Sequence, residues 1–231
     1  MYGVITGASS EIGKEIAISL AESNYNLILT YFKNDISNFK EELINKYNVD
    51  VVLLKCDISK ENDIKKLYEL SKNKNIKVLV NASAINMDSE VIDKTKEDFM
   101  KVLEVNLVGT FLVSKYISNI MEKGIIINIS SLDSTKTFNS YSIDYIASKA
   151  GVNTLVKTMS LYYKNIKFIS LLLPFVKTKS VLEMNEELLK GEMSKYNQKE
   201  LLDPKVVGEK VINIINDDKL STGSIIEMEE F

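Results

Sequence analysis

Residues 1–20, MYGVITGASSEIGKEIAISL, decide the fold of this chain. An apolar run at residues 2–6 leads into a polar turn that starts with Gly7 and ends with Gly13, and a helical pattern follows. In a doubly wound parallel sheet, the first strand-to-helix turn presents backbone N–H groups to a phosphate. Gly7 permits a tight exit from the strand, and Gly13 lets the helix pack closely against the sheet. The candidate cofactor-binding residues of this turn are Gly7, Ser9, Ser10 and Ile12.

Glu11 stands where such a turn carries a further glycine. Its carboxylate lies in the first turn of the predicted helix, where the helix dipole stabilises a negative charge by about 0.3–1 kcal/mol. A carboxylate that faced the pyrophosphate would repel it. Because backbone N–H groups do the binding, we expect the nucleotide site to be retained with some loss of affinity.

Six further apolar runs alternate with helical patterns along the chain. The runs cover residues 26–32, 51–57, 77–83, 124–131, 167–175 and 223–229. The helical patterns between them cover residues 37–48, 60–73, 95–123 and 146–164. Strands this apolar are buried on both faces, which predicts an α/β fold: a Rossmann-type doubly wound parallel sheet of about seven strands with helices on both faces. We expect one domain over residues 1–231.

The segment after Pro174 breaks this rhythm, because residues 179–202 form a long connection rich in lysine and glutamate. A long connection at the open end of such a sheet favours a lid over a substrate; the alternative is a pair of surface helices.

The composition excludes several classes of chemistry. The chain has 29 lysine or arginine residues, all of them lysine, and no histidine. Serine–histidine hydrolysis, histidine-ligated zinc and arginine-finger phosphoryl transfer are thereby excluded, so proton transfer must use Tyr, Lys, Asp or Glu. The single cysteine, Cys56, cannot form an intramolecular disulfide or a cysteine cluster for a metal, and we expect it to be a buried apolar residue.

The net charge of −3 is too close to balance to indicate nucleic acid as a partner. No run of eighteen apolar residues and no charged-then-apolar leader occurs, so we expect neither a membrane span nor a signal peptide, and a cytoplasmic protein.

The end of the second predicted strand bears on the choice of nucleotide. A carboxylate about 20 residues after the glycines would hold an unphosphorylated ribose. The sequence LTYFKND instead offers Tyr31 and Lys33, and a lysine suits a 2′-phosphate. We therefore expect NADP(H) rather than NAD(H).

Tyr145 and Lys149 are four residues apart and share one face of a predicted helix. A tyrosine of pKa about 10 exchanges protons at neutral pH only if a nearby cation stabilises its phenolate. The same spacing occurs in Tyr68/Lys72 and Tyr163/Lys167. Only Tyr145/Lys149 follows an apolar strand and has small neighbours that let a ligand approach, so we expect it alone to lie in a site.

The motifs TGASSEIG, CDIS, VNASA, VNLVG, NISS, YIASK and P-FVKT follow one another at matching intervals. In this combination the chain resembles the classical short-chain dehydrogenase/reductase family over its whole length. The resemblance implies that Tyr145 protonates a carbonyl oxygen, that Lys149 lowers the pKa of Tyr145 and holds the nicotinamide ribose, that Ser131 binds the substrate oxygen and that Asn106 holds a water linked to Lys149. The further cofactor contacts that it implies are Asp57, Ile58, Asn81, Ala82, Pro174, Val176 and Thr178. A helix hydrogen bond for Asn106 and a turn cap for Asp57 remain open as purely structural roles.

The chain departs from the family pattern in several places. Ala82 and Ala84 stand where Asn and Gly are usual, and the glycine after Pro174 is missing. One extra residue separates Ser131 from Tyr145, which leaves Ser130 as a second candidate for binding the substrate oxygen.

Within the family, the chain is most similar to the 3-oxoacyl-(acyl-carrier-protein) reductases of fatty acid biosynthesis, which implies an acyl-thioester or other small carbonyl substrate. A pteridine reductase and a non-catalytic nucleotide-binding homologue are the alternatives. We expect residues 179–202 and 132–144 to set the specificity. Residues 99–121 and 150–163 are apolar over more than one helical face. We therefore expect a homo-oligomer and favour a tetramer over a dimer.

Overall fold

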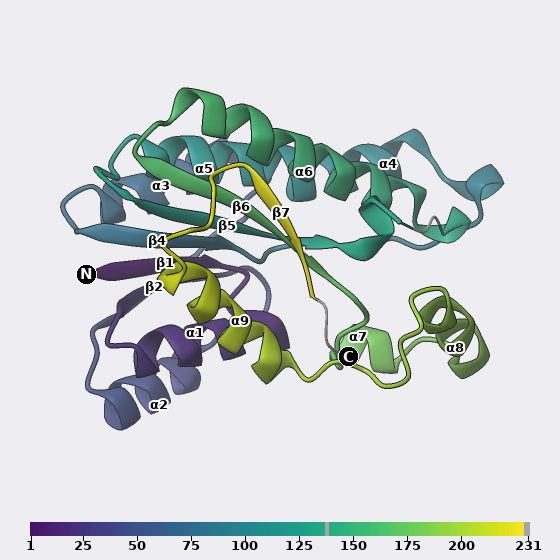
Figure 1. The fold of residues 1–231 in the computed structure, drawn as a ribbon, viewed down its shortest axis with the longest axis horizontal. Coiled ribbons are helices and arrows are strands. Elements are labelled where there is room, and N and C mark those ends of the chain that lie inside the picture. The colour runs from purple at the N-terminus through teal and green to yellow at the C-terminus, as the bar shows by residue number, and fades with distance from the viewer. Residues whose placement is uncertain (137–138, 229–231) are drawn as a thin grey trace.

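The structure, a computed structural model, describes residues 1–136 and 139–228 (Figure 1). Its centre is a parallel sheet with the strand order β3-β2-β1-β4-β5-β6-β7. The strands are β1 (Tyr2–Thr6), β2 (Asn26–Tyr31), β3 (Val51–Lys55), β4 (Ile76–Asn81), β5 (Gly124–Ser131), β6 (Ile166–Leu173) and β7 (Ser224–Glu227). All seven predicted strands are confirmed, although residue 229 of the last predicted run lies outside the described residues. Strands β2 and β3 are added on one side of β1, and strands β4 to β7 on the other side. Doubly wound sheets bind nucleotides at the point where this order reverses, here between β1 and β4.

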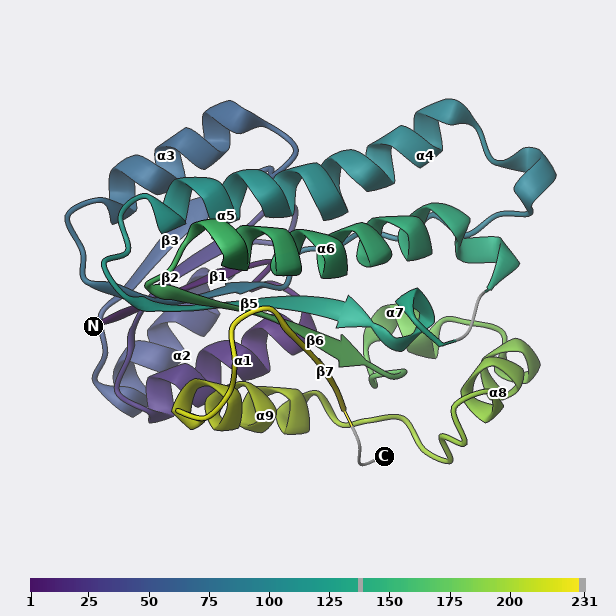
Figure 2. The ribbon, with the colours of Figure 1, turned by 45° about the horizontal axis from the view of Figure 1, so that its top comes forward.

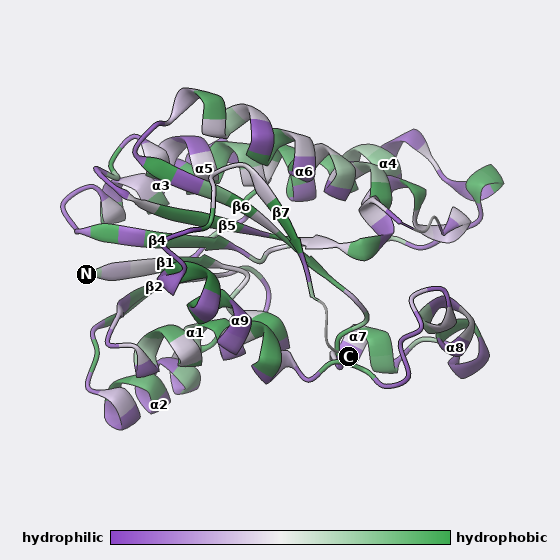
Figure 3. Ribbon diagram, viewed as in Figure 1, coloured by the Kyte–Doolittle hydropathy of each residue, from purple (hydrophilic) through white to green (hydrophobic). Residues whose placement is uncertain are grey.

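Helices cover both faces of the sheet, as Figure 1 shows. On one face lie α1 (Glu11–Glu22), α2 (Ser37–Tyr47) and α9 (Pro204–Asn216). On the other lie α3 (Glu61–Ser71), α4 (Lys96–Leu103), α5 (Thr110–Ser118) and α6 (Ile143–Tyr162). Successive side chains of a strand point to opposite faces of the sheet. In β1, Val4 packs with the second set of helices and Ile5 packs with the first. This burial on both faces explains the unbroken apolar runs, seen as largely green central strands in Figure 3.

The helical pattern over residues 95–123 is confirmed, with one irregularity that the sequence did not predict. Between α4 and α5 the helical run continues through a π-helical turn, Glu104–Gly109. The Asn106 side chain is fully buried and bonded to the backbone of Ile85, and a side chain on Gly109 would approach the carbonyl oxygen of Ile58 to 2.7 Å. The π-helical turn therefore coincides with contacts to two segments distant in sequence, at Ile85 and Ile58.

The segment of residues 179–202 leaves the sheet beyond the carboxyl ends of β5 and β6 (Figure 2). It carries two short helices, α7 (Lys179–Leu182) and α8 (Glu186–Ser194). Its two ends are joined by a parallel bridge between Val176 and Leu202, with hydrogen bonds of 2.8 and 3.0 Å on either side. The segment thus starts and returns at one place, next to the end of β6.

Cys56 is buried at the end of β3, as expected. Burial, reinforced by the nearby carboxylates of Asp63 and Asp57, raises the pKa of its thiol to about 12. The thiol is therefore protonated and unreactive at neutral pH. Within residues 1–136 and 139–228, no helix has both the length and the apolar character needed to cross a membrane.

Candidate active site

The first strand-to-helix turn has the geometry that its glycines predict. Gly7 has φ +70°, and a Cβ there would lie 2.8 Å from the Cα of Ser83. A Cβ on Gly13 would lie 2.3 Å from the carbonyl oxygen of Gly7. Ser10 caps α1: its hydroxyl accepts a hydrogen bond from the Gly13 N–H at 3.0 Å and donates one to the Gly7 carbonyl at 2.9 Å. Neither glycine tolerates a side chain without displacing backbone.

This turn suits the pyrophosphate of a dinucleotide. It lies at the carboxyl end of β1, at the switch point of the sheet, with the N-terminus of a twelve-residue helix above it. Thr6 accepts hydrogen bonds from the N–H groups of Ala82 and Ser83, at 3.2 and 3.3 Å, which brings the segment after β4 beside the turn. The predicted contacts on both segments are therefore neighbours.

Glu11 is exposed and reaches across to the segment that follows β6. Its Oε1 accepts a hydrogen bond from the backbone N–H of Lys179, at 3.3 Å. Thr178, the preceding residue, is buried and occupies the position directly before α7. The carboxylate thus joins the nucleotide turn to α7, next to the predicted cofactor contacts Val176 and Thr178. Pro174 and Val176 are buried as well, so their side chains pack into the protein.

The region predicted to bind the adenosine contains an acid, Asp35, that the sequence analysis did not consider. The Tyr31 hydroxyl donates a hydrogen bond to Asp35, and this bond raises the pKa of Tyr31. Lys33 is exposed. Asp35 lies only four residues after the last residue of β2, so the region holds a carboxylate as well as the predicted lysine.

Further along this side, Asp57 accepts hydrogen bonds from the N–H and hydroxyl of Ser59, at 3.0 and 2.7 Å, and so caps a turn. Ile58 is buried against the π-helical turn. The amide of Asn81 is turned into the core, where its nitrogen bonds Ser114 and Asn128, each at 2.9 Å. The side chains of Asp57 and Asn81 thus have structural partners, and their contacts with a cofactor remain predictions.

Tyr145 and Lys149 lie on one face of α6, with the Lys149 Nζ 5.5 Å from the centre of the Tyr145 ring. The Nζ donates a hydrogen bond to the carbonyl of Ile129, at 2.8 Å, which ties the lysine to β5. Lys149 is 4 % exposed, and this burial lowers its pKa to about 8. The other two pairs of equal spacing have different surroundings; for example, Lys72 pairs with Glu69 in solvent.

The pKa of Tyr145 moves in the direction opposite to that expected. Burial raises it first, and the carboxylates of Asp133 and Asp88 raise it further. Both acids arrive from loops, after β5 and after β4 respectively, and their effect could not be inferred from the Tyr–Lys spacing. The phenol is therefore firmly protonated at neutral pH, as a proton donor requires.

Of the two serines at the end of β5, Ser131 fits the predicted role better. Ser130 is 2 % exposed and its hydroxyl lies 3.5 Å from the carbonyl of Lys149. Ser131 is half-buried, and its hydroxyl accepts a hydrogen bond from the N–H of Asp133 at 3.2 Å. Asp133 in turn accepts a hydrogen bond from Tyr196, in the 179–202 segment.

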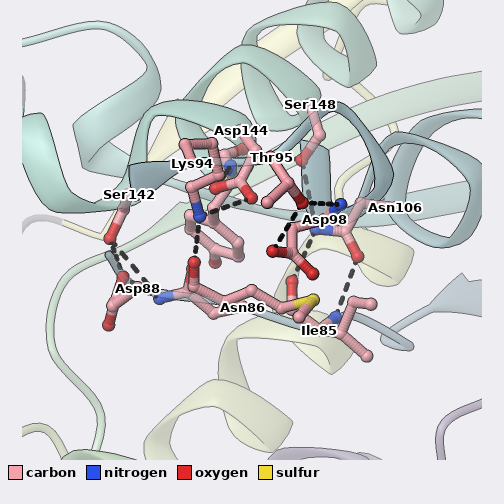
Figure 4. Close-up of polar contacts among 12 residues, drawn as sticks. Ile85, Asn86, Asp88, Lys94, Thr95, Asp98, Asn106, Ser142, Asp144 and Ser148 are labelled. Carbon is pink, nitrogen blue, oxygen red and sulfur yellow. Dashed lines mark hydrogen bonds and ion pairs between the residues drawn. The ribbon is translucent and has the colours of Figure 1, made fainter. Parts of the chain in front are cut away.

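Both polar atoms of the Asn106 side chain have hydrogen-bond partners within the protein. Its Oδ1 accepts from the Ile85 N–H at 2.9 Å, and its Nδ2 donates to the Ile85 carbonyl at 2.9 Å and to Ser148 at 3.1 Å. Figure 4 shows these bonds linking the segment after β4 with α6. A structural role is thus present, and the predicted water contact stays a prediction.

Lys94 and Asp144 form a buried ion pair, also drawn in Figure 4, that the sequence did not predict. The only available signal was the position of Asp144, directly before Tyr145. Part of the predicted specificity loop, residues 137 and 138, lies outside the described residues.

Comparison with known proteins gives matches over most of the chain. The family model described as short chain dehydrogenase matches residues 3–189. A 3-oxoacyl-(acyl-carrier-protein) reductase of Aquifex aeolicus is 31 % identical over 193 residues, covering 80 % of this chain and 77 % of the relative. Glucose 1-dehydrogenase 2 of Bacillus subtilis is 30 % identical over 195 residues, covering 80 % and 75 %. An uncharacterized oxidoreductase of Thermotoga maritima is 29 % identical over 178 residues, covering 72 % and 68 %.

Proposed function

Because the chain belongs to the short-chain dehydrogenase family and its relatives are oxidoreductases, we propose that it is an NADPH-dependent reductase that converts a carbonyl into an alcohol. The observation that supports this most directly is the pair of half-buried Tyr145 and buried Lys149, which Lys149 anchors to β5 two residues before Ser131. It lies at the same edge of the sheet as the nucleotide turn.

The dinucleotide would supply a hydride to the carbonyl carbon. The Tyr145 hydroxyl, which is protonated at neutral pH, donates its proton to the carbonyl oxygen. The Ser131 hydroxyl donates a hydrogen bond to the same oxygen. Lys149 stabilises the phenolate left behind, which a proton from solvent then restores. Asn106 would hold a water on that proton path.

The proposed substrate is a 3-oxoacyl thioester, which the similarity to the Aquifex aeolicus reductase supports. The test is NADPH oxidation by purified protein with a 3-oxoacyl thioester, with a dihydropterin as the pteridine reductase alternative and with glucose plus NADP⁺ as the reverse reaction. Dinucleotide binding without turnover of any carbonyl would instead support the non-catalytic homologue.

The preference for NADPH depends on Lys33, and Asp35 favours NADH as the second candidate. We expect Lys33→Glu to lower the NADPH:NADH affinity ratio about tenfold or more, since a carboxylate beside the 2′-phosphate replaces attraction with repulsion at a partly exposed site. Fluorescence titration with both dinucleotides measures this ratio. The matched variant Asp35→Asn should raise it, and an unchanged ratio in both variants would place the 2′-phosphate elsewhere.

Glu11 should weaken the binding of either dinucleotide. We expect Glu11→Gln to tighten NADPH about two- to fivefold, because it removes one exposed negative charge from the pyrophosphate turn. The gain should shrink at high salt, since exposed charges are screened. Glu15→Gln, one turn further along α1, serves as the control. Weaker binding by Glu11→Gln would mean that the bond to Lys179 matters more than the repulsion.

We further propose that the protein forms a homo-oligomer, with a tetramer favoured over a dimer. We also propose that it is cytoplasmic and that residues 179–202 act as a lid. Large apolar side chains are exposed along the α4–α5 rod and at the end of α6; these are Met100, Val108, Phe111, Leu161 and Tyr162. Apolar helix faces without a partner favour association between copies. Light scattering of the purified chain measures the molar mass in solution and so tests the oligomeric state.

A further inference from the structure

A charged pair with no part in the proposed chemistry is buried beside Tyr145. The Nζ of Lys94 lies 2.9 Å from Oδ2 of Asp144, and the two side chains are 5 % and 0 % exposed. Lys94 also donates a hydrogen bond to the backbone carbonyl of Met87. Replacing a buried ion pair by uncharged residues often costs no stability, so stability alone does not explain the pair.

Asp144 contacts Tyr145 directly. Its Oδ1 accepts a hydrogen bond from the backbone N–H of Tyr145, at 2.9 Å. Tyr145 is the third residue of α6, and the first N–H groups of a helix have no acceptor within the helix. One oxygen of Asp144 therefore fixes the first turn of α6, and the other binds Lys94 (Figure 4).

The pair joins two segments that border the site. Lys94 and Met87 both belong to the connection between β4 and α4, and Asp144 lies in the first turn of α6. A second link runs in parallel, because the Ser142 hydroxyl donates to Asp88 and the Asn86 amide donates to the same carboxylate oxygen. The start of the tyrosine helix is thus held by side chains from the segment after β4.

We propose that Lys94 is a positioning residue for the reduction: through Asp144 it fixes the helical turn that carries Tyr145, and it neutralises the carboxylate nearest to that turn. The inference rests on the proposed role of Tyr145 as proton donor. The charged groups that face this turn from the packed elements are Asp88, Asp98, Asp133 and Lys149. Two of these acids already raise the pKa of the phenol, so a third uncompensated carboxylate would make it a still weaker acid.

The variant Lys94→Met leaves Asp144 buried without its cation, which raises the pKa of that carboxyl. As the pH rises through this new pKa, a negative charge forms beside Tyr145. We expect kcat to fall by up to about 100-fold with little change in the KM for NADPH, because the tyrosine is misplaced while the nucleotide turn is untouched. The pH profile should gain an added ionisation, with activity falling as the pH rises through it.

The double variant Lys94→Met/Asp144→Asn separates positioning from general destabilisation. Asparagine keeps the oxygen that accepts the Tyr145 N–H and removes the charge. The added ionisation should disappear, and part of kcat should return. Lys66→Met, which breaks an exposed pair with Asp63, is the matched control and should change neither quantity.

Hydrogen exchange at the Tyr145 amide gives a readout that needs no activity. Exchange should be faster in Lys94→Met and restored in the double variant. If the unmodified protein reduces no carbonyl, the proposed function fails, while the exchange data still decide whether Lys94 fixes this turn. Unchanged exchange in Lys94→Met, or a single variant whose pH profile shows no added ionisation, would overturn the proposal.

Discussion

Tyr145→Phe should abolish carbonyl reduction while leaving NADPH binding intact. The substitution removes one hydroxyl from a half-buried ring and leaves the packing of α6 unchanged. Because general acid catalysis contributes about 10²- to 10⁴-fold, we expect kcat to fall by that factor. The measurement combines the rate of NADPH oxidation with a fluorescence titration of the same protein.

Tyr163→Phe is the matched control, since Tyr163 has the same spacing to a lysine and its hydroxyl donates a hydrogen bond to Asn119 at the surface, at 3.3 Å. It should keep full activity. If Tyr145→Phe turned over at the original rate, another group would have to protonate the substrate, and the proposed mechanism would be wrong.

Gly13→Ala should destabilise the protein and weaken dinucleotide binding together. The new Cβ would lie 2.3 Å from the Gly7 carbonyl and 2.9 Å from the Cα of Ala8, and all of these contacts are with backbone. Overpacking of this kind costs about 1–3 kcal/mol. The turn must open to relieve it, so the N–H groups of α1 lose their alignment. Urea unfolding and NADPH titration measure the two effects.

Gly191→Ala provides the opposite control on α8. A Cβ there meets no atom within 4 Å, so the substitution should stabilise the protein by about 0.4–1 kcal/mol through the unfolded state. Equal effects of the two substitutions would show that the close packing at Gly13 is not rigid.

The sequence predicts the sheet well because the central strands β1, β2, β4, β5 and β6 are buried on both faces and are therefore largely apolar. It predicts the Gly7–Gly13 turn because close backbone contact there leaves no room for a side chain. It does not predict the π-helical turn at Glu104–Gly109, since Asn106 bonds to Ile85, 21 residues away. Such a contact exists only once the segments have packed.

The candidate site, like the fold, could be predicted from the sequence only in part. The spacing of Tyr145 and Lys149 places both on one helical face, which local geometry guarantees. The electrostatic environment of the phenol depends on Asp88 and Asp133, which come from two different loops. The Lys94–Asp144 pair spans 50 residues and shows no local pattern. Sequence spacing predicts contacts within an element, and charges brought in by other elements require the fold.

The 179–202 segment touches both halves of the site. At its start, the Lys179 N–H bonds Glu11 on the nucleotide turn, and near its end Tyr196 bonds Asp133 beside Tyr145. A segment attached to two binding regions makes the two occupancies interdependent, and by thermodynamic linkage the dependence is mutual. If the nucleotide changes the affinity for the substrate through this segment, the substrate changes the affinity for the nucleotide by the same factor. Two hydrogen bonds at opposite ends of one connection would then set the size of that coupling.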